Sequence, residues 1–516
     1  MAAGRIGSYE KVNIDFNPKF PPLKKVTDKT KIDVRYSLIA PFAFVHIYWN
    51  PKIYELVYEV EEPILNEEEE KYRQQIVNAM RDMINFYNVV EKEKETALLD
   101  YIDSRFKVLA IELGMDMSYE SYKKIYYYLC RDFIGLDEIE PIIRDFFVED
   151  IECNGIDSPV YIVHRIYRNM RTNVKFNDLG RIESFVEKVA QRCGKYISYA
   201  DPILDGTLPD GSRVNATYTK DITSRGPTFT IRKFTESPWT PSQLLSFNTL
   251  SPEMLAYLWI LVQYKMNILI TGGTGSGKTT LLNAVAFFIP PEARVVSIED
   301  TRELNLPREN WLPSVVRETT GIGGKDISLF TLLRSSFRQN PDYVIVGEVR
   351  GKEAFVLFQG MASGHSSLST IHAESVDTVI KRLETPPIEL SPTLLNVLDC
   401  ICIMTHAIVK NQETRKLREI VEIIDVNPEG VAVTNTPFIW NPSDDKFYFK
   451  KNSKIFEKIA VRYGITVEEL NSEFVKRTNL LYVLYQNGVF GFEEFQSVIE
   501  EYYKKPDDVL ARYGIK

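Results

Sequence analysis

Residues 267–279 read Asn267-Ile-Leu-Ile-Thr271-Gly272-Gly-Thr-Gly-Ser-Gly277-Lys278-Thr279, and this stretch decides the fold class. The residues before the glycines have the pattern of a buried strand, and a helical pattern follows over 279–287. A strand, a loop of the form GxxxxGK[ST] and a helix together predict a phosphate-binding loop. The glycines let backbone N–H groups turn inward around phosphate oxygens, and the helix presents its positive end. A chance glycine-rich turn is the alternative, and the flanking elements argue against it.

Two side chains of this loop predict the ligands. Lys278 is placed to reach the β- and γ-phosphates, and the Thr279 hydroxyl is placed to bind Mg²⁺. ATP and Mg²⁺ are therefore the expected ligands. The nucleotide-binding residues are expected to be Gly272, Gly273, Thr274, Gly275, Ser276, Gly277, Lys278, Thr279 and Thr280.

Helical and strand patterns alternate around the loop. Helices are expected over 252–264, 279–287 and 329–338, and strands over 267–271, 294–298 and 343–346. This alternation predicts an α/β fold with a parallel sheet covered on both faces. A hairpin followed by helices is expected towards the C-terminus.

The part of the chain before this region has a mixed α and β pattern. Helices are expected over 63–87, over most of 98–147 and over 180–193, strands over 36–49, 212–218 and 228–232, and a hairpin over 160–174. Asp205–Gly206 and Asp210–Gly211 are predicted turns, and Pro238 to Pro241 is a predicted short linker. With 516 residues, the chain is expected to form two or three domains.

Acidic residues follow two of the predicted parallel strands. Glu299 and Asp300 end the first of these strands, with Glu303 shortly after, and Glu348 ends the second. Because ligands bind beyond the carboxyl ends of parallel strands, both groups are expected to face the phosphates. Gly347 stands where the usual Walker B pair has its Asp. We predict that Glu299 activates the attacking water and that Glu348 holds Mg²⁺, in part through water. Capped strand ends are the alternative.

Two histidines follow, at His365 and His372. The segment 367–371 between them alternates polar and apolar residues, which favours a strand. A metal site formed by these two residues alone is not expected, because no third ligand is evident. Hydrogen bonding near the phosphates, as a sensor of nucleotide state, is the functional interpretation, and His372 is included among the catalytic candidates. A structural role is an equal alternative for His365.

The composition of the chain limits which other classes of function are expected. Lys and Arg number 62 and Asp and Glu 71, a net charge of −9, which does not favour a broad nucleic-acid footprint. The five cysteines contain no CxxC pair, so a four-cysteine zinc site is not expected, and Cys400 and Cys402 are expected as buried thiols. No secretory signal is visible, and the apolar stretch 254–270 contains polar interruptions, so a membrane span is not predicted. A cytoplasmic location is expected.

Taken together, these motifs resemble the secretion ATPase superfamily of type II and type IV systems, of the general secretion pathway protein E type. The resemblance rests on the phosphate loop, on 299–303, on 338–351 and on the histidine box ending at His372. Gly in place of Asp, as at position 347, is common in this family. Upstream, 149–155, 163–165, 210–216 and 229–234 look like its archaeal branch, which includes archaellum motor and archaeal pilus assembly ATPases. The similarity covers about 137–424, and the four-cysteine module of bacterial type II members is absent.

The resemblance implies a homohexameric ring on the cytoplasmic membrane. Its domains would be a subfamily-specific region 1–110, an α+β domain 111–236, a linker 237–243, a RecA-like ATPase domain 244–430 and a hairpin and helical region 431–516. ATP hydrolysis would move the domains and act on a polytopic membrane platform protein to build or turn a pilus-like filament. Arg213 and Arg232 are the expected arginines that stabilise transition-state charge when the domains close, and surface arginines are the alternative reading.

Two other functions stay open beside the filament motor. A conjugation or DNA-uptake ATPase would need a basic channel, which the net charge of −9 does not support. A nucleotide-gated scaffold would bind ATP without turnover, and the presence of Lys278, Glu299 and Glu348 argues against it. The sequence does not distinguish an archaellum, an adhesive pilus and a secretion system.

Overall fold

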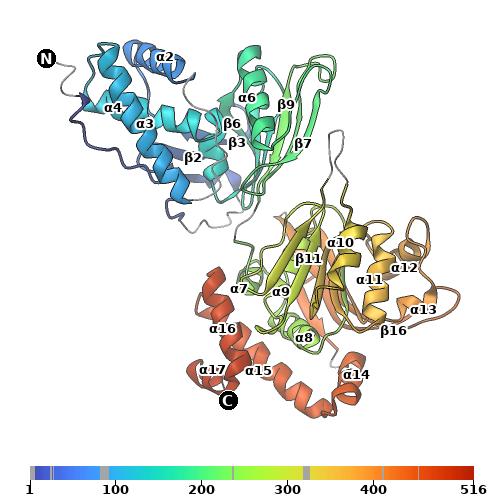
Figure 1. The fold of residues 1–516 in the computed structure, drawn as a ribbon. Coiled ribbons are helices and arrows are strands. Elements are labelled where there is room, and N and C mark those ends of the chain that lie inside the picture. The colour runs from blue at the N-terminus through green and yellow to red at the C-terminus, as the bar shows by residue number, and fades with distance from the viewer. Residues whose placement is uncertain are drawn as a thin grey trace. The chain divides into compact units, whose positions relative to one another are not determined.

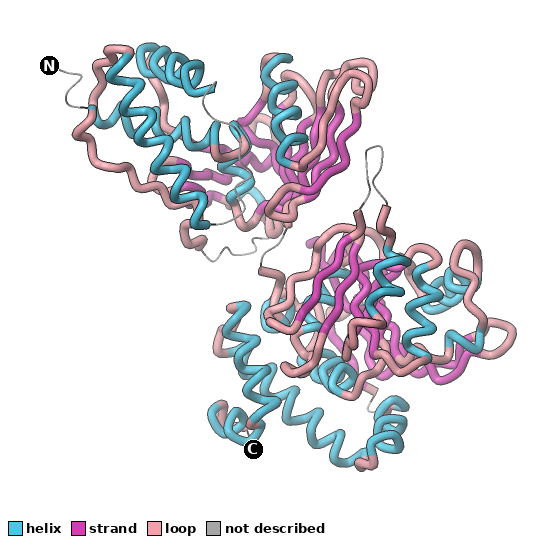
Figure 2. The backbone as a smooth tube through the Cα atoms, in the orientation of Figure 1, coloured by secondary structure: helices cyan, strands magenta, loops and turns pink. Residues whose placement is uncertain are grey.

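The computed structural model describes residues 6–515 except 22, 24, 25, 27, 82–91, 235, 236, 318–325, 410, 411 and 451. The chain forms two compact units, Met1–Phe234 and Thr235–Lys516. Each unit is built around its own nine-stranded sheet, and Figure 2 shows the strands of each unit gathered among its helices.

The sheet of the first unit has the strand order β1-β2-β3-β6-β5-β4-β9-β8-β7. All neighbours are antiparallel except β3 and β6, which run parallel. Strands of the first 110 residues therefore share one sheet with later ones. The strands are β1 (Asp33–Ile39), β2 (Ala43–Asn50), β3 (Glu55–Glu61), β4 (Val148–Cys153), β5 (Pro159–His164), β6 (Arg168–Lys175), β7 (Ile203–Thr207), β8 (Arg213–Thr217) and β9 (Thr228–Arg232).

Helices cover the buried face of this sheet, and α6 is the helix that covers β9. The rings of Phe185 on α6 and Phe229 on β9 lie 4.8 Å apart. Along β7, β8 and β9 every second residue is buried, so the opposite face of these three strands is open. The helices are η1 (Lys29–Lys31), α2 (Glu67–Arg81), α3 (Lys92–Glu112), α4 (Tyr119–Phe133), η2 (Asp137–Ile139), α5 (Glu140–Arg144) and α6 (Leu179–Arg192).

Three predictions for this unit were wrong in part. The strand expected over 36–49 is two strands, because Pro41 and Phe42 form a turn between them. The helix expected from 63 begins at Glu67, since Asn66 caps it through reciprocal hydrogen bonds with Glu69; its expected end lies in 82–91, outside the described residues. Asp205–Gly206 lies inside β7 and is not a turn.

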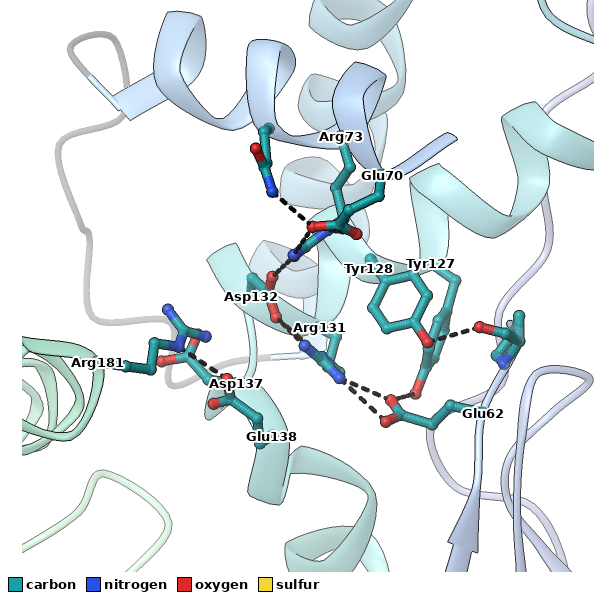
Figure 3. A network of polar contacts seen from close by, with 12 residues as sticks. Glu62, Glu70, Arg73, Tyr127, Tyr128, Arg131, Asp132, Asp137, Glu138 and Arg181 are labelled. Carbon is teal, nitrogen blue, oxygen red and sulfur yellow. Dashed lines mark hydrogen bonds and ion pairs between the residues drawn. The ribbon is translucent and has the colours of Figure 1, made fainter. Parts of the chain in front are cut away.

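A network of charged side chains ties the helices of the first unit to the end of β3 (Figure 3). The Arg131 guanidinium of α4 is 7% exposed and pairs with Glu62 at 3.0 Å and with Asp132 at 2.8 Å. Asp132 also accepts from Arg73 of α2 at 2.8 Å. A buried arginine is tolerated only when its charge is compensated, so this network fixes α2 and α4 relative to the sheet.

The second unit confirms the predicted α/β class. Its strand order is β12-β11-β13-β14-β10-β15-β16-β17-β18, and β12 to β15 in that order run parallel. The strands are β10 (Ile268–Gly272), β11 (Val295–Glu299), β12 (Trp311–Val315), β13 (Tyr343–Val349), β14 (Ser366–Ile371), β15 (Cys400–Val409), β16 (Gln412–Val426), β17 (Ala432–Asn441) and β18 (Lys446–Phe449).

Helices cover both faces of this sheet (Figure 1). Ile268 and Ile270 of β10 join a core with α8, α9 and the C-terminal helices, whereas Leu269 joins a second core with α10 to α13. The expected buried thiols Cys400 and Cys402 are confirmed. The helices are α7 (Pro241–Ser246), α8 (Pro252–Gln263), α9 (Lys278–Ala286), α10 (Leu329–Ser336), α11 (Glu353–Ala362), α12 (Val376–Glu384), α13 (Pro392–Leu395), α14 (Lys454–Tyr463), α15 (Val467–Gln486), α16 (Phe492–Lys504) and α17 (Pro506–Arg512).

The C-terminal helices form an integral part of the second unit. Trp259 of α8 stacks on Phe288 and lies under the Arg477 guanidinium of α15, 4.6 Å from its ring centre. Glu422 of β16 is fully buried and accepts from the Tyr257 hydroxyl and from the Lys454 backbone N–H. These contacts hold α14 and α15 against the sheet that carries the phosphate loop.

Candidate nucleotide site

The glycine-rich loop leaves the carboxyl end of β10 and leads into α9, as predicted. Gly275 and Gly277 have φ angles of +69° and +95°, which favour glycine. Gly277 is the N-cap of α9, and no side chain caps this helix. The N–H groups of the first turn are therefore open to a ligand, which is the arrangement that binds phosphate.

Lys278 lies over the loop. Its Nζ donates to the carbonyl oxygens of Gly272 and Gly273 at 3.2 Å and 3.1 Å. Burial lowers the pKa of Lys278, while the charges of Glu348 and Glu303 act to raise it. Lys278 thus lies close enough to Glu348 of β13 and to Glu303, which follows β11, to feel their charges.

One hydroxyl group of the loop has a structural role, and the others are accessible. Ser276 is buried, and its Oγ donates to the Gly273 carbonyl at 2.8 Å, which closes the loop on itself. Thr274 is exposed, and Thr279 and Thr280 are half-buried. Thr279 is therefore accessible for the predicted role as a Mg²⁺ ligand, whereas Ser276 serves the shape of the loop.

Glu299 at the end of β11 is a buried carboxylate, and only one of its two oxygens accepts hydrogen bonds from the described residues. Its Oε1 accepts from the backbone N–H groups of Glu303 and Leu304, both at 2.9 Å. Its Oε2 is buried and has no hydrogen-bond partner among the described residues. Burial raises the pKa of Glu299 to about 7, against the lowering effect of the two N–H groups. Such a group is able to accept a proton near neutral pH.

Gly347 explains why the side chain of Glu299 fits where it does. Strands β11 and β13 are neighbours, with Ile298 opposite Val346. A β-carbon placed on Gly347 would lie 3.1 Å from Cγ of Glu299. The absence of a side chain at position 347 therefore makes room for Glu299 of the neighbouring strand; that Glu299 takes over the role of the missing Asp stays a prediction.

Arg350 organises the second carboxylate cluster and was not singled out from the sequence. Its guanidinium pairs with Glu348, and its Nη1 lies 3.6 Å from Oδ2 of Asp300. It thereby connects the ends of β13 and β11, and its charge also lowers the pKa of Lys278. In the sequence, only its position two residues after Glu348 pointed to this role, because its pairing with Asp300 depends on the order of the strands.

Mg²⁺ is the metal that the predicted site would bind. No group of three or more His, Cys, Asp or Glu side chains within the described ranges could hold a metal by itself. Mg²⁺ is typically held by one or two carboxylates together with substrate phosphates and water. The half-buried Glu348 and Thr279 fit that requirement, and Lys278 lies close enough to Glu348 to feel its charge.

The two histidines stand at opposite ends of β14, which confirms the predicted strand. His365 precedes it; its Nδ1 lies 3.3 Å from the Gly360 carbonyl, and its ring is 4.8 Å from that of Phe337. These contacts fit a structural role. His372 follows β14 at the same edge as the phosphate loop, and Arg382 donates to its carbonyl at 2.6 Å. Its role as a sensor stays a prediction.

The two predicted arginines lie together in the first unit. Arg213 of β8 and Arg232 of β9 are cross-strand partners. Both are exposed on the open face of the sheet, opposite α6, and Nη2 of Arg213 lies 3.3 Å from Oδ2 of Asp205. Adjacent guanidinium groups on an open face are suited to binding an anion. Their contact with a nucleotide stays a prediction.

Comparison with known proteins identifies the family. A model of the type II/IV secretion system protein family matches residues 136–430, which is more than half of the 516 residues. The chain belongs to this family. The resemblance predicted from the motifs is therefore confirmed.

Relatives of this type II/IV secretion system protein include archaeal and bacterial chains. It is 36% identical to an uncharacterized protein of Methanocaldococcus jannaschii over 90% of its own length and 87% of the relative's, which agrees with the predicted archaeal branch. It is 35% identical to the type IV secretion system protein PtlH of Bordetella pertussis, over 40% of this chain and 67% of that one. The solved structure of the pilus retraction motor PilT with bound ADP is 17% identical, covering 73% of this chain and 98% of that one, with a TM-score of 0.39.

None of the described helices of this family member is both long and apolar enough to cross a membrane. The apolar stretch that runs into the phosphate loop forms α8 and β10 of the core, as expected.

Proposed function

We propose that this chain is an ATP-hydrolysing motor that powers assembly or rotation of a pilus-like filament through a membrane platform protein. One observation carries the proposal. A buried carboxylate, Glu299, ends β11 at the same edge of the parallel sheet as the phosphate loop; it lies in space left by Gly347, and one of its oxygens has no hydrogen-bond partner among the described residues. A scaffold that only binds ATP would have no use for such a group.

The site residues divide the work of hydrolysis. Lys278 and the open N–H groups at the start of α9 would hold the phosphates. Thr279 and Glu348 would hold Mg²⁺, which when bound neutralises phosphate charge. Glu299 would orient the attacking water and accept its proton, since a pKa of about 7 allows both protonation states near neutral pH. Arg350 would position Glu348 through their ion pair.

Coupling of hydrolysis to movement would use the first unit. Arg213 and Arg232 would meet the phosphates when the two units close, so that hydrolysis is fast only in the closed state. We infer a homohexamer on the cytoplasmic membrane, as is usual for this family. The regions 1–110 and 431–516 would carry the contacts specific to the subfamily.

A turnover assay tests the proposal against its alternatives. The purified protein should release phosphate from Mg·ATP, and Glu299→Gln should not. Stimulation by membranes that contain the platform protein would support a filament motor, whereas stimulation by DNA would support a conjugation or DNA-uptake ATPase. Tight ATP binding without phosphate release under every condition would show a nucleotide-gated scaffold. The genes that flank this one would indicate the type of filament.

A further inference from the structure

The end of β9 leads directly into the boundary between the two units. The strand ends at Arg232, and the first unit ends shortly after it, at Phe234. The backbone N–H of Lys233 donates to the Glu149 carbonyl at 2.8 Å, which continues the pairing of β9 with β4. The backbone N–H of Phe234 donates to Oγ of Ser212 at 3.1 Å. These contacts hold the segment that carries Arg232 against the body of the first unit.

The side chain of Lys233 adds a contact on the buried face of the sheet. Successive residues of a strand point to opposite faces, so Lys233 extends inward whereas Arg232 lies on the open face. The Lys233 ammonium donates to the backbone carbonyl of Asp145, the C-cap of α5. Burial lowers the pKa of Lys233 to about 8, while the negative charge of Asp145 acts to raise it. The ammonium group is therefore largely removed from water and held beside Asp145.

The side chain of Asp145 is in turn fixed by two tyrosines. It is fully buried, and its Oδ2 accepts from the hydroxyl groups of Tyr36 at 2.6 Å and of Tyr58 at 2.7 Å. Its Oδ1 accepts from the backbone N–H of Phe147 at 2.8 Å. Leaving any of these buried groups without its partner would be costly, so the turn at Asp145 has one well-defined position.

The two tyrosines come from a distant part of the same sheet. Tyr36 lies on β1 and Tyr58 on β3, whereas β9 is separated from β3 by β6, β5 and β4. Both β1 and β3 belong to the region 1–110, which was predicted to be specific to the subfamily. Asp145 thus connects this region to the residue that follows Arg232 without passing through the intervening strands.

We propose that Lys233 is a positioning residue for the predicted arginine pair, and that its contact with Asp145 makes this pair depend on β1 and β3. The inference rests on the proposed function, in which Arg213 and Arg232 stabilise the transition state. These two residues are cross-strand partners, so a shift at the end of β9 moves one guanidinium relative to the other. Such a shift slows hydrolysis and leaves phosphate binding at the loop of the second unit unchanged.

A double-mutant cycle tests whether Lys233 acts through Arg232. Lys233→Met keeps the aliphatic chain and removes the ammonium group. It should lower kcat roughly tenfold to hundredfold, because small displacements of a catalytic group have large effects on rate, and leave ADP affinity within about twofold of wild type. In the Arg232→Ala background the same change should lower kcat less than about twofold, because the group that Lys233 positions is already absent. Steady-state phosphate release and ADP calorimetry measure the two quantities.

Tyr58→Phe tests the same contacts with a smaller change, and it stays informative if Lys233→Met does not fold. It removes one hydrogen bond to Asp145 and should lower kcat about threefold to tenfold, again without effect in Arg232→Ala. Tyr122→Phe is its matched control, because Tyr122 of α4 is equally buried and donates to Asp103 at 2.8 Å. The control should lower Tm to a similar extent and leave kcat unchanged.

Lys188→Met is the matched control for Lys233→Met. Lys188 of α6 also donates to a backbone carbonyl, that of Asp132, and burial lowers its pKa as well. Its replacement should lower Tm and leave kcat unchanged, because its contacts lie among the helices and not at the end of β9.

The outcomes separate failure of this assignment from failure of the proposed function. If wild type releases no phosphate, or if Arg232→Ala and Arg213→Ala both turn over like wild type, the proposed role of the arginines fails and this inference fails with it. If Arg232→Ala is slow while Lys233→Met and Tyr58→Phe turn over like wild type, only the assignment fails. An equal loss of kcat from Lys233→Met in both backgrounds, or from Lys188→Met and Lys233→Met alike, would also overturn it, because Lys233 would then serve the fold in general.

Discussion

The side chain of Glu299 occupies space next to Gly347 that any other residue at position 347 would restrict. A β-carbon at 347 would lie 3.1 Å from Cγ and 3.6 Å from Oε1 of Glu299. The two positions are coupled because β11 and β13 are adjacent in the sheet. The predicted base and the residue that replaces the usual Asp are therefore two parts of one arrangement.

Gly347→Ala tests this coupling. The added methyl group should displace the Glu299 carboxylate and lower kcat roughly tenfold to hundredfold, since small shifts of a catalytic group have large effects on rate. ADP binding, which does not involve Glu299, should be unchanged. Thermal denaturation of Gly347→Ala, Glu299→Asp and the double variant would measure the coupling. The shorter Asp should recover part of the Tm lost by Gly347→Ala; strictly additive losses would contradict a shared space.

Lys278→Ala should abolish hydrolysis and weaken nucleotide binding. Lys278 is the one cation among residues 272–280 of the loop, and its contacts with the Gly272 and Gly273 carbonyls show that it lies over the loop. Steady-state phosphate release and ADP calorimetry would check both effects. Turnover close to that of wild type would rule out this active site.

Neutralising Glu299 and neutralising Glu348 are expected to impair different steps, hydrolysis in the first case and Mg²⁺ binding in the second. Glu299→Gln should bind Mg·ATP and hydrolyse it about 10² to 10⁴ times more slowly, which is the usual loss for a general base. Glu348→Gln should lose affinity for Mg²⁺, because this carboxylate lies near Lys278 and not in the buried position of Glu299. Titration of nucleotide binding with Mg²⁺ would separate them. Loss of affinity in Glu299→Gln with normal affinity in Glu348→Gln would reverse the roles.

The raised pKa of Glu299 predicts opposite pH dependences for rate and stability. The base must be deprotonated, so kcat should fall about tenfold for each pH unit below 7. The folded state holds this proton more tightly than the unfolded state, whose pKa is near 4.5. Stability from this group is therefore complete below pH 4.5 and is lost as pH rises through 7, by up to about 3 kcal/mol.

Glu299→Gln checks the stability half of this prediction. Its amide does not ionise, so its Tm should exceed that of wild type at about pH 8 and approach it at about pH 5. Asp342→Asn should show the opposite pH dependence of the Tm difference. Partial burial acts to raise the pKa of Asp342, but hydrogen bonds from Arg294 and Lys265 lower it overall. A Tm difference for Glu299→Gln that does not change with pH would mean that Glu299 is ionised throughout.

Local patterns predicted the phosphate loop, the parallel strands and the acidic strand ends. Neighbours in space were not predictable in the same way. The pairing of Arg350 with Asp300 and the fit of Glu299 beside Gly347 both depend on strand order. The hairpin of β1 and β2 was read as one strand because the apolar pattern continues through Pro41, although proline cannot donate to a ladder. Gly206 was read as a turn, whereas it lies in β7 against the Cys193 side chain.

Arg213 and Arg232 carry the last prediction, that closure brings the first unit onto the nucleotide. They are cross-strand partners on an open sheet face, so both guanidinium groups can approach one anion together. The contact would form fully only in the closed state, and its loss should affect turnover more than binding. Alanine at one of the two positions should lower kcat by roughly 10³-fold, as for other arginines that stabilise phosphoryl transfer, while ADP affinity and Tm stay near those of wild type.

Arg171→Ala is the matched control, because Arg171 is also exposed but lies on β6, separated from β9 by β4 and β5. In a structure with an ATP analogue, at least one of the two groups should lie within hydrogen-bond distance of a phosphate in some subunits and away from it in others. Normal turnover of both alanine variants, with both guanidinium groups in solvent in every nucleotide-bound subunit, would remove the physical basis for coupling hydrolysis to domain movement.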